Sequence, residues 1–434
     1  MHNIFFLINT CWIFISEFIQ YTFFNNYDKF IGNIMHRLVS INVLYVKVFQ
    51  AFALNNSIID KKLNAELMKY TDNAPWTNND IAWETISELE NKYDLDFGDY
   101  IPINAGMVSI VFKSINKTTN ENIIVKMQRK NIHRDLEKAI QQLLFMVYMF
   151  SFIPVLKCLN LEEIIKKNTS LLYLQLDFKT EVSNMQNMKL NCKHLTYVKI
   201  PRVYDNITDN YPNVIMMEYI EGDKITDIDP ADSIHYAKLC VKFGFTTLLI
   251  HGVSHADLHI GNILFIKNPN LNNKYQIGIL DFGIVYNIHS DLRNKLLEIF
   301  VDLFQEDIKN TAYRFLYCGL LEPIENIEKI PKIHKENIIN IISNFFIKGK
   351  DMNNKNKIQV NIYKSILELK KYLDENELSV CGIYPSDSFV QMQLALAMND
   401  GLVSTFNKYD NYIDIIDSVI TEMFHLDILL EDEL

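Results

Sequence analysis

Dense runs of lysine and arginine are absent from this sequence of 434 residues, and its formal net charge is −11. A surface that binds nucleic acid normally concentrates positive charge, so we expect no nucleic-acid partner. The six cysteines form no C-x-x-C pair, which argues against a zinc ribbon or disulfide framework and favours a reducing, intracellular compartment. Glycine and proline are also scarce, at 13 and 10 residues, whereas 49% of the residues are hydrophobic. This composition is typical of a globular chain.

The N-terminal segment Ile4–Phe24 is mostly apolar, but Glu17 interrupts it. No Lys or Arg precedes Lys29, so the segment lacks the basic start of a signal peptide and the arginines of a mitochondrial presequence. A single membrane span fits its length, although a charge inside the bilayer would be costly. We favour a helix that packs against the protein or lies on a membrane surface. A lipid or membrane surface is therefore a candidate partner.

Hydrophobic periodicity divides the chain into three parts. Residues 1–96 are predicted to form a helical N-terminal extension. Residues 97–222 contain a predicted β-hairpin and further strands, with a helical insertion at 130–176. Residues 223–434 are predicted to be mainly helical. The pattern therefore predicts an α+β fold, with a small β-rich lobe followed by a larger helical one.

Two motifs in the second half of the chain point to phosphoryl transfer. This chemistry needs a carboxylate that orients the attacking group, oxygen ligands for Mg²⁺ and a cation on the phosphates of ATP. Asp257 and Asn262 have the H-x-D-x-x-x-x-N spacing of kinase catalytic loops, and Asp281-Phe-Gly follows a short apolar strand. Either motif alone would indicate an ordinary cap or turn. Together they predict Asp257 as the catalytic carboxylate, Asn262 and Asp281 as metal ligands, and ATP and Mg²⁺ as cofactors.

Histidines recur every four residues in the same segment, at His251, His255 and His259. A zinc site is therefore an alternative interpretation. The spacing differs from that of hydrolase-type zinc motifs. Because a catalytic-loop histidine often supports the backbone, we favour a structural role.

A single cation, Lys126, lies in the apolar strand Ile123–Met127, as the phosphate-anchoring lysine of kinases does. Glu181, in the predicted helix Phe178–Met185, is its expected ion-pair partner. Upstream, Ile103–Val111 has the frame of the glycine-rich loop of kinases but keeps only the middle glycine, Gly106. Glu218 and Tyr219 lie at the end of the last predicted strand of the small lobe, where the adenine is expected. The residues predicted to contact the nucleotide are Ile103, Asn104, Ala105, Gly106, Val111, Lys126, Glu218 and Tyr219.

Together these motifs resemble the UbiB/ADCK family of atypical kinases over most of the chain. The segment His255–Asn262 is similar to the family's H-A-D-P-H-P-G-N, and Val125–Arg129 to its V-K-V-Q-R. Lys47–Gln50 resembles its K-x-G-Q, and Gln175-Leu-Asp177 its E-x-D. The resemblance implies a bilobal protein-kinase-like fold and regulatory roles for Lys47, Gln50, Gln175 and Asp177. It also implies an association with coenzyme Q and other isoprenoid-lipid metabolism.

The chain departs from the family pattern at three places. Phe49 replaces the glycine of K-x-G-Q, Gln175 replaces the glutamate of E-x-D, and Asn104-Ala-Gly106 replaces three alanines. These departures put the family's regulation in question more than its nucleotide binding. We nevertheless expect Lys47–Gln50 to fold over the catalytic cleft and exclude protein substrates.

Three functions stay open on the sequence. The first is an active UbiB-like kinase or ATPase. The second is a small-molecule kinase of the aminoglycoside or choline type, whose catalytic loop is similar but which lacks the Lys47–Gln50 segment. The third is a non-catalytic pseudokinase, for which we would expect loss of Lys126, Asp257 or Asp281, and all three are present.

Overall fold

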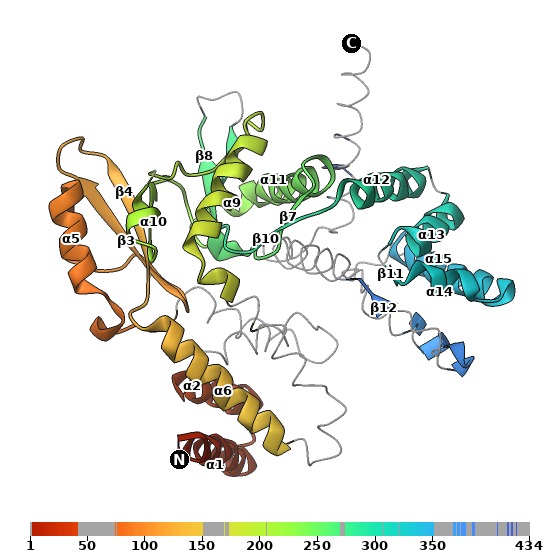
Figure 1. Ribbon diagram of the computed structural model, residues 1–434, viewed down its shortest axis with the longest axis horizontal. Helices are drawn as coiled ribbons and strands as arrows, with labels where there is room; N and C mark the ends of the chain where they lie inside the picture. The colour runs from red at the N-terminus through yellow and green to blue at the C-terminus, as the bar shows by residue number, and fades with distance from the viewer. Residues whose placement is uncertain are drawn as a thin grey trace. The chain divides into compact units, whose positions relative to one another are not determined.

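A computed structural model describes residues 2–41, 74, 76–150, 169, 173–204, 206–269, 274–305, 307–319 and 321–350, with scattered positions between 368 and 422 (Figure 1). The chain separates into two compact units. The first comprises Met1–Gln186 and Pro201–Tyr219, and the second Asn187–Ile200 and Ile220–Leu434. The three-part division at residues 96 and 222 stays a prediction.

An antiparallel sheet forms the centre of the first unit. Its strands run in the order β1-β3-β4-β6, and β2 pairs with β3. Their bounds are β1 Leu95–Asp96, β2 Asn104–Ala105, β3 Ser109–Asn116, β4 Asn122–Gln128 and β6 Val214–Glu218. A tight turn that includes Asn120, at φ 58°, joins β3 to β4. The long hairpin of these two strands is the one that the sequence predicts.

The two faces of this sheet have different surroundings, because side chains alternate along each strand. One face packs against helix α5 (Trp83–Tyr93), which lies along β3 and β4 in Figure 1. Its buried apolar residues include Ile86 and Leu89 of α5 and Phe112, Val125 and Met216 of the sheet. The opposite face presents Val111 and Lys126, which are cross-strand partners.

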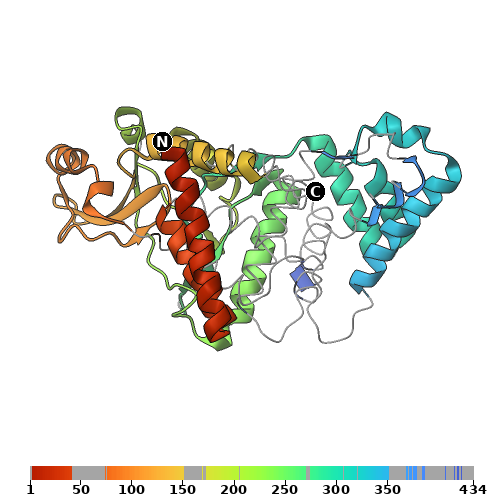
Figure 2. The same ribbon diagram turned by 90° about the horizontal axis from the view of Figure 1, so that it is seen from below.

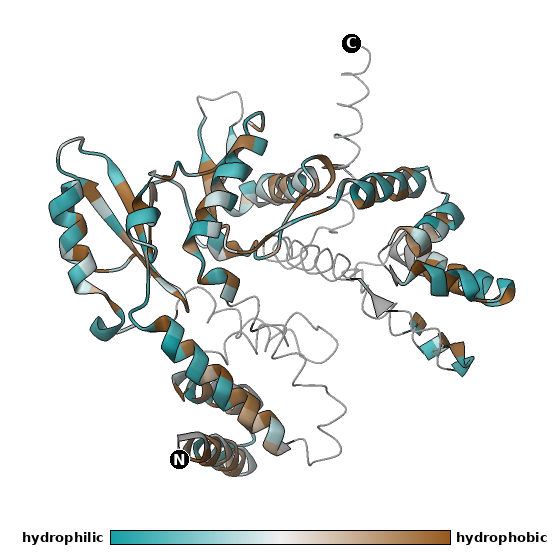
Figure 3. Cartoon of the chain, in the orientation of Figure 1, coloured by the Kyte–Doolittle hydropathy of each residue, from teal (hydrophilic) through white to brown (hydrophobic). Residues whose placement is uncertain are grey.

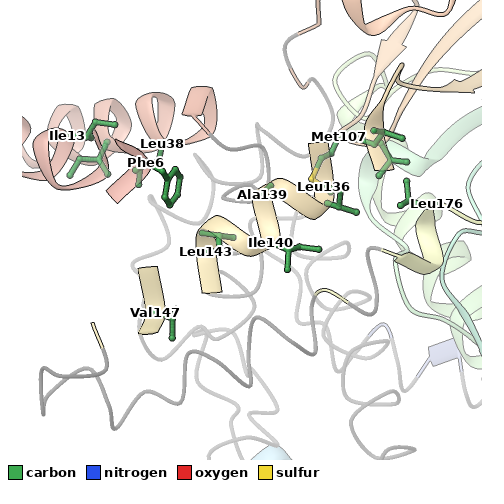
Figure 4. Packing of buried hydrophobic residues seen from close by; sticks show 13 residues of the cluster. Phe6, Ile13, Leu38, Met107, Leu136, Ala139, Ile140, Leu143, Val147 and Leu176 are labelled. Carbon is green, nitrogen blue, oxygen red and sulfur yellow. The ribbon is translucent and has the colours of Figure 1, made fainter. Parts of the chain in front are cut away.

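Three helices form a second apolar cluster in the same unit. They are α1 (His2–Phe24), α2 (Tyr27–Ile41) and α6 (Ile132–Phe150). Figure 2 shows α1 and α2 side by side. Figure 4 shows apolar side chains of this cluster from α1, α2 and α6, together with Met107 from the loop before β3. The helical N-terminal segment expected from the sequence is present in α1 and α2.

Further helical elements begin in the first unit, whose boundary at Gln186 falls within the first of them. Helix α9 (Phe178–Asn191) follows the segment that ends at Asp177, and the short helix α10 (Ile207–Asn210) precedes β6. A 3-10 turn, η1 (Asn78–Asp80), precedes α5.

The described part of the second unit contains helices and three small sheets, two of which are formed by strands between residues 198 and 287. Strands β5 (Val198–Lys199), β9 (Tyr275–Ile279) and β8 (Ile263–Lys267) form one sheet, and β7 (Val253–His255) pairs with β10 (Val285–Asn287) in the other. Strand β5 is short and ends at Lys199, two residues before Pro201. Helix α11 (Ser233–Phe245) continues into a π-helical turn, η3 (Thr246–Ile250).

Further helices follow the second of these sheets. They are α12 (Ser290–Phe304), α13 (Ile308–Tyr317), α14 (Ile324–Lys329) and α15 (Lys332–Lys350). Ala312, Leu316, Ile327 and Ile338 belong to their shared apolar core. A two-residue strand pair, β11 (Leu321–Glu322) with β12 (Tyr384–Pro385), lies in the same region of the chain. The mainly helical character of this half agrees with the sequence pattern.

Candidate active site

Lys126 lies near the middle of β4, between Val111 of β3 and Ile215 of β6. Its ammonium group is 2.5 Å from Glu181 Oε1, and only 7% of Lys126 and 2% of Glu181 are exposed. A cation in such a place needs an anionic partner, because burial removes the water that would stabilise its charge. The ion pair that we expected between the strand and the helix is therefore confirmed.

The start of α9 positions Glu181 in the first turn of that helix. Asp177 caps the helix: its carboxylate accepts hydrogen bonds from the Thr180 amide at 3.1 Å and from the Thr180 hydroxyl at 2.7 Å. These hydrogen bonds lower the pKa of the Asp177 carboxyl. Gln175 lies two residues earlier, in a short helical turn. The regulatory roles of Gln175 and Asp177 stay predictions.

The segment predicted to contact the nucleotide forms β2 and a tight turn before β3. The Ile103 amide donates to Val111 O, and the Gly106 amide donates to Ser109 O at 2.8 Å. The Ala105 carbonyl accepts from the amide of Ala74. Asn104 Oδ1 is buried and has no hydrogen-bond partner among the described residues. A bound hydroxyl or amino group would satisfy this oxygen, so the loop fits a polar ligand such as ATP.

Glu218 ends β6 and Tyr219 follows it, where we expect the adenine to bind. The Glu218 amide donates to Arg202 O at 2.8 Å, and the Glu218 carboxylate accepts from the Arg202 amide at 3.1 Å. The Lys113 ammonium lies 4.3 Å from the centre of the Tyr219 ring. These contacts fix the end of the strand, and the adenine contact stays a prediction.

In the second unit, His255 connects the two motifs that the sequence singles out. His255 Nε2 is 2.6 Å from the carbonyl oxygen of Asp281, and His255 Nδ1 accepts from the Asp257 amide at 3.3 Å. A nitrogen that accepts carries no proton, so this arrangement requires the neutral tautomer with its proton on Nε2. Burial lowers the pKa of His255 below its ordinary value of 6.5, which keeps the ring neutral.

Asn262 and Asp281 come together because β8 and β9 pair as antiparallel strands. Asn262 immediately precedes β8, and its carbonyl accepts from Leu280, the residue before Asp281, at 3.0 Å. The Asn262 amide group donates to Asp257 O at 3.1 Å. Asp281 Oδ1 accepts from the Gly283 amide at 2.9 Å. The second unit thus brings Asp257, Asn262 and Asp281 to neighbouring loops.

These donors fit a hard divalent cation. The hydrogen bond from Asn262 to Asp257 O uses the side-chain nitrogen Nδ2, and the other polar atom of the Asn262 side chain is the oxygen Oδ1. Carboxylate and amide oxygens are the ligands that Mg²⁺ prefers. Asn262 and Asp281 would hold the ion, whose charge would neutralise part of the charge on bound phosphates.

The zinc interpretation of the three histidines disagrees with the contacts of His255. Both of its ring nitrogens already bond to backbone groups. Within the described part of the chain, no group of three His, Cys, Asp or Glu side chains has a metal-binding arrangement. His255 therefore has the structural role that we favoured.

The sequence reasoning missed Gln128 and Arg129 as site-building residues. The Gln128 side-chain amide donates to Leu176 O at 2.6 Å, and Arg129 Nε donates to Gly106 O at 3.0 Å. Both residues belong to Val125–Arg129, the segment that resembles the family's V-K-V-Q-R. Their position close after Lys126 is the sequence feature that could have indicated a role in the site. Lys47 and Gln50 lie outside the described residues, so their predicted position over the cleft stays a prediction.

A family model described as the ABC1 atypical kinase-like domain matches residues 71–314, which is more than half of the chain. The chain is similar to the chloroplastic protein ACTIVITY OF BC1 COMPLEX KINASE 1 of Arabidopsis thaliana, at 28% identity over 68% of this chain and 43% of that protein. It is also similar to a probable protein kinase UbiB of Shewanella baltica, at 25% identity over 64% of this chain and 51% of that protein.

Other comparisons concern length and fold. The uncharacterized Synechocystis protein slr1919 is 25% identical over 68% of this chain, and the match spans 52% of that protein. The chain thus spans about half, or less, of the length of the curated relatives it matches. The Rv3197–erythromycin complex from Mycobacterium tuberculosis has a TM-score of 0.50 and 16% identity, and the match covers 86% of this chain and 90% of that one.

The structural likeness supports the fold alone, whereas the family model matches the region that contains every catalytic motif described above. The predicted α+β, protein-kinase-like fold with a helical N-terminal region is confirmed. The chain belongs to the ABC1 atypical kinase-like family, together with relatives named UbiB and ACTIVITY OF BC1 COMPLEX KINASE.

Proposed function

We propose that this chain is an ATP- and Mg²⁺-dependent phosphotransferase or ATPase. The observation that carries the proposal is the buried pair of Lys126 and Glu181, 2.5 Å apart on the face of the sheet that also presents Val111. A lysine held in this way offers a fixed positive charge to the phosphates of a nucleotide. A solvated strand lysine would not need a buried glutamate at this distance.

Roles for the second unit follow from its loops. Asp257 orients or deprotonates the attacking group, which is an acceptor hydroxyl in a kinase and water in an ATPase. Its backbone is fixed on both sides, because its amide donates to His255 and its carbonyl accepts from Asn262. Asn262 and Asp281 are the proposed Mg²⁺ ligands.

The test is incubation of the protein with Mg²⁺ and ATP labelled at the γ-phosphate. Three reactions are compared: protein alone, protein with a lipid extract, and protein with generic peptides. Label in lipid supports an isoprenoid-lipid or other lipid acceptor, and free phosphate alone supports an ATPase. Label in peptides would overturn the expected exclusion of protein substrates.

Variants distinguish these reactions from contamination. Lys126→Met and Asp257→Asn should each lose turnover. Lys332→Met, on α15, is the matched control and should keep it. If wild type binds ATP but neither hydrolyses it nor transfers its phosphate, the hypothesis of a non-catalytic nucleotide-binding pseudokinase is favoured. If wild type does not bind ATP, the proposed function is wrong.

A second proposal concerns the membrane, and one helix carries it. Helix α1 contains the one segment, Ile4–Phe24, that is long and apolar enough to cross a membrane among the described residues. Its charged residue, Glu17, faces inward: it is 3% exposed and bonds to Arg37 and Asn33 of α2 at 2.7 and 3.0 Å. Figure 3 colours most of α1 as hydrophobic, and the outward face of the helix is largely apolar. It includes Phe5, Ile8, Trp12 and Ile15, which are 52% to 66% exposed.

We propose that this outer face of α1 lies on a lipid surface. Water around such an apolar face is unfavourable, and acyl chains would replace it. Since the opposite face of α1 packs against α2 and α6, a surface position fits the structure better than a span.

Flotation with vesicles of mixed neutral and anionic phospholipids tests this proposal. Full-length wild type should float, and the variant Ile8→Asn/Trp12→Asn/Ile15→Asn should lose most of the binding. Ile333→Asn removes an isolated exposed apolar residue on α15, 66% exposed, and should float like wild type. Equal flotation of all three proteins would show that α1 is not the contact.

A further inference from the structure

Arg129 holds three separate parts of the first unit together. Its Nε donates to Gly106 O at 3.0 Å, its Nη1 lies 3.3 Å from Asp80 Oδ2, and its Nη2 donates to Ala74 O at 3.4 Å. The side chain is only 9% exposed. A planar guanidinium can serve several acceptors in fixed directions at once, which a lysine ammonium on its flexible stem cannot do.

The contact with Gly106 fixes the orientation of one peptide group. In a trans peptide, the carbonyl and the following amide point in opposite directions. Because Arg129 binds the Gly106 carbonyl, the Met107 N–H must point away from the guanidinium. Among the residues that the structure describes, no acceptor is found for this N–H.

The neighbouring groups prevent this peptide from turning over. The Gly106 amide donates to Ser109 O, and Val108 O accepts from the Arg129 amide at 2.9 Å. The side chains of Met107 and Val108 are each 8% exposed and belong to the apolar cluster with α6 (Figure 4). The backbone of this turn is thus anchored by apolar packing and by hydrogen bonds at both ends.

We propose that Arg129 is a positioning residue that aims the Met107 N–H at a phosphate group of the bound nucleotide. This inference rests on the proposed ATP-binding function and adds to it a donor and the residue that orients it. Backbone N–H groups in tight turns are common ligands of phosphate oxygens. Arg129 itself contacts protein groups, so it acts through the peptide and not on the nucleotide.

Ala74 is also held in this network of hydrogen bonds. Ala74 accepts from Arg129 through its carbonyl and donates to Ala105 O through its amide, so residue 74 is bonded both to the turn and to the residue that holds it.

The experiment compares ATP with adenosine, because adenosine lacks the phosphates that the Met107 N–H would bind. Dissociation constants for Mg·ATP and adenosine are measured by calorimetry on the full chain. For Arg129→Ala we expect about a tenfold weaker affinity for Mg·ATP, the order of one hydrogen bond to a charged group. The affinity for adenosine should be unchanged.

Two further variants separate positioning from folding. Arg129→Lys keeps the charge but not the planar fork, so it should also lose ATP affinity selectively, by about threefold. It decides the matter if Arg129→Ala does not fold. Lys130→Ala is the matched control, since the Lys130 side chain makes an exposed contact with Glu84 at 3.7 Å, and both affinities should equal those of wild type.

The outcomes are distinct. An equal loss of affinity for both ligands would mean that Arg129 only stabilises the fold, and unchanged affinities would show that the turn needs no such anchor. Either result overturns the inference about Arg129, whereas the proposed ATP binding by wild type would still stand. Failure of wild type to bind Mg·ATP would instead remove the proposed function, and this inference with it.

Discussion

The two units fix their proposed reacting groups by different means. In the first, Lys126 meets Glu181 as a buried pair of full charges, joined across 55 residues of sequence. In the second, a neutral histidine and backbone groups hold Asp257 and Asp281 within one short stretch of chain. Removing one partner of a buried charge pair is strongly destabilising, because the other charge stays buried without compensation. Removing one neutral hydrogen bond from a network costs only the contribution of that bond. The first arrangement should therefore be the more fragile.

The largest effect is expected from Glu181→Ala. This change leaves the Lys126 ammonium buried without its carboxylate, and breaking such a pair costs about 3–5 kcal/mol. The free energy of unfolding is measured by urea denaturation. The comparison is Glu84→Ala, which removes an exposed partner of Lys130 and should cost less than about 1 kcal/mol. Similar losses for the two variants would contradict the distinction between a buried and an exposed pair.

Asp281→Asn tests the second unit through its proposed metal site. An amide binds Mg²⁺ much more weakly than a carboxylate does. We expect the affinity for Mg·ATP to fall on the order of a hundredfold, about 2.7 kcal/mol. Thermal-shift titration should then show no stabilisation at concentrations that stabilise wild type.

The control for this change is Asp291→Asn, at an aspartate of the same unit that is 79% exposed. It should respond to Mg·ATP as wild type does. If Asp281→Asn is stabilised equally well, Asp281 is not a metal ligand.

His255→Gln should have a smaller effect, about 1–2 kcal/mol, because it removes neutral hydrogen bonds only. The effect should depend on pH. Since the folded-state pKa of His255 lies below 6.5, the unfolded chain binds more protons as the pH falls below this value. The contribution of His255 to wild-type stability should therefore be fully present above about pH 6.5. It should decrease on acidification by at most about 1.4 kcal/mol per pH unit.

Urea denaturation of both proteins from pH 7.5 to 5 measures this difference. The other histidines are common to both chains, so the gap between the two curves isolates His255. We expect the difference in free energy of unfolding between wild type and His255→Gln to become smaller as the pH falls. A gap of constant size would show that His255 titrates alike in the folded and unfolded chain.

The same contrast explains what could be predicted from sequence. The catalytic-loop residues lie close together in the chain, and their spacing was enough to predict that Asp257, Asn262 and Asp281 share neighbouring loops. Glu181 was identified only because a helix was expected there, and its pairing with Lys126 depends on tertiary packing. Arg129 was missed because its partners, Gly106, Asp80 and Ala74, are 23 to 55 residues away. No local pattern marks a side chain whose role is to hold distant backbone groups.

The smallest effect is expected at Gly106, and its sign is opposite to those above. A methyl group added there would meet Ser109 O at 3.7 Å and Ser109 Oγ at 4.0 Å, which are ordinary contacts, and Gly106 does not have the positive φ that excludes other residues. Alanine also restricts the unfolded chain, so Gly106→Ala should stabilise the protein by about 0.4–1 kcal/mol. Gly98→Ala is the matched control: nothing lies within 4 Å of the added methyl group, but the φ of +57° at Gly98 is unfavourable for alanine, so this change should destabilise the protein. Urea denaturation of the two variants gives the answer directly. Destabilisation by Gly106→Ala would mean that the turn needs glycine's freedom, for instance to move when nucleotide binds, and that Arg129 does not hold it in a single conformation.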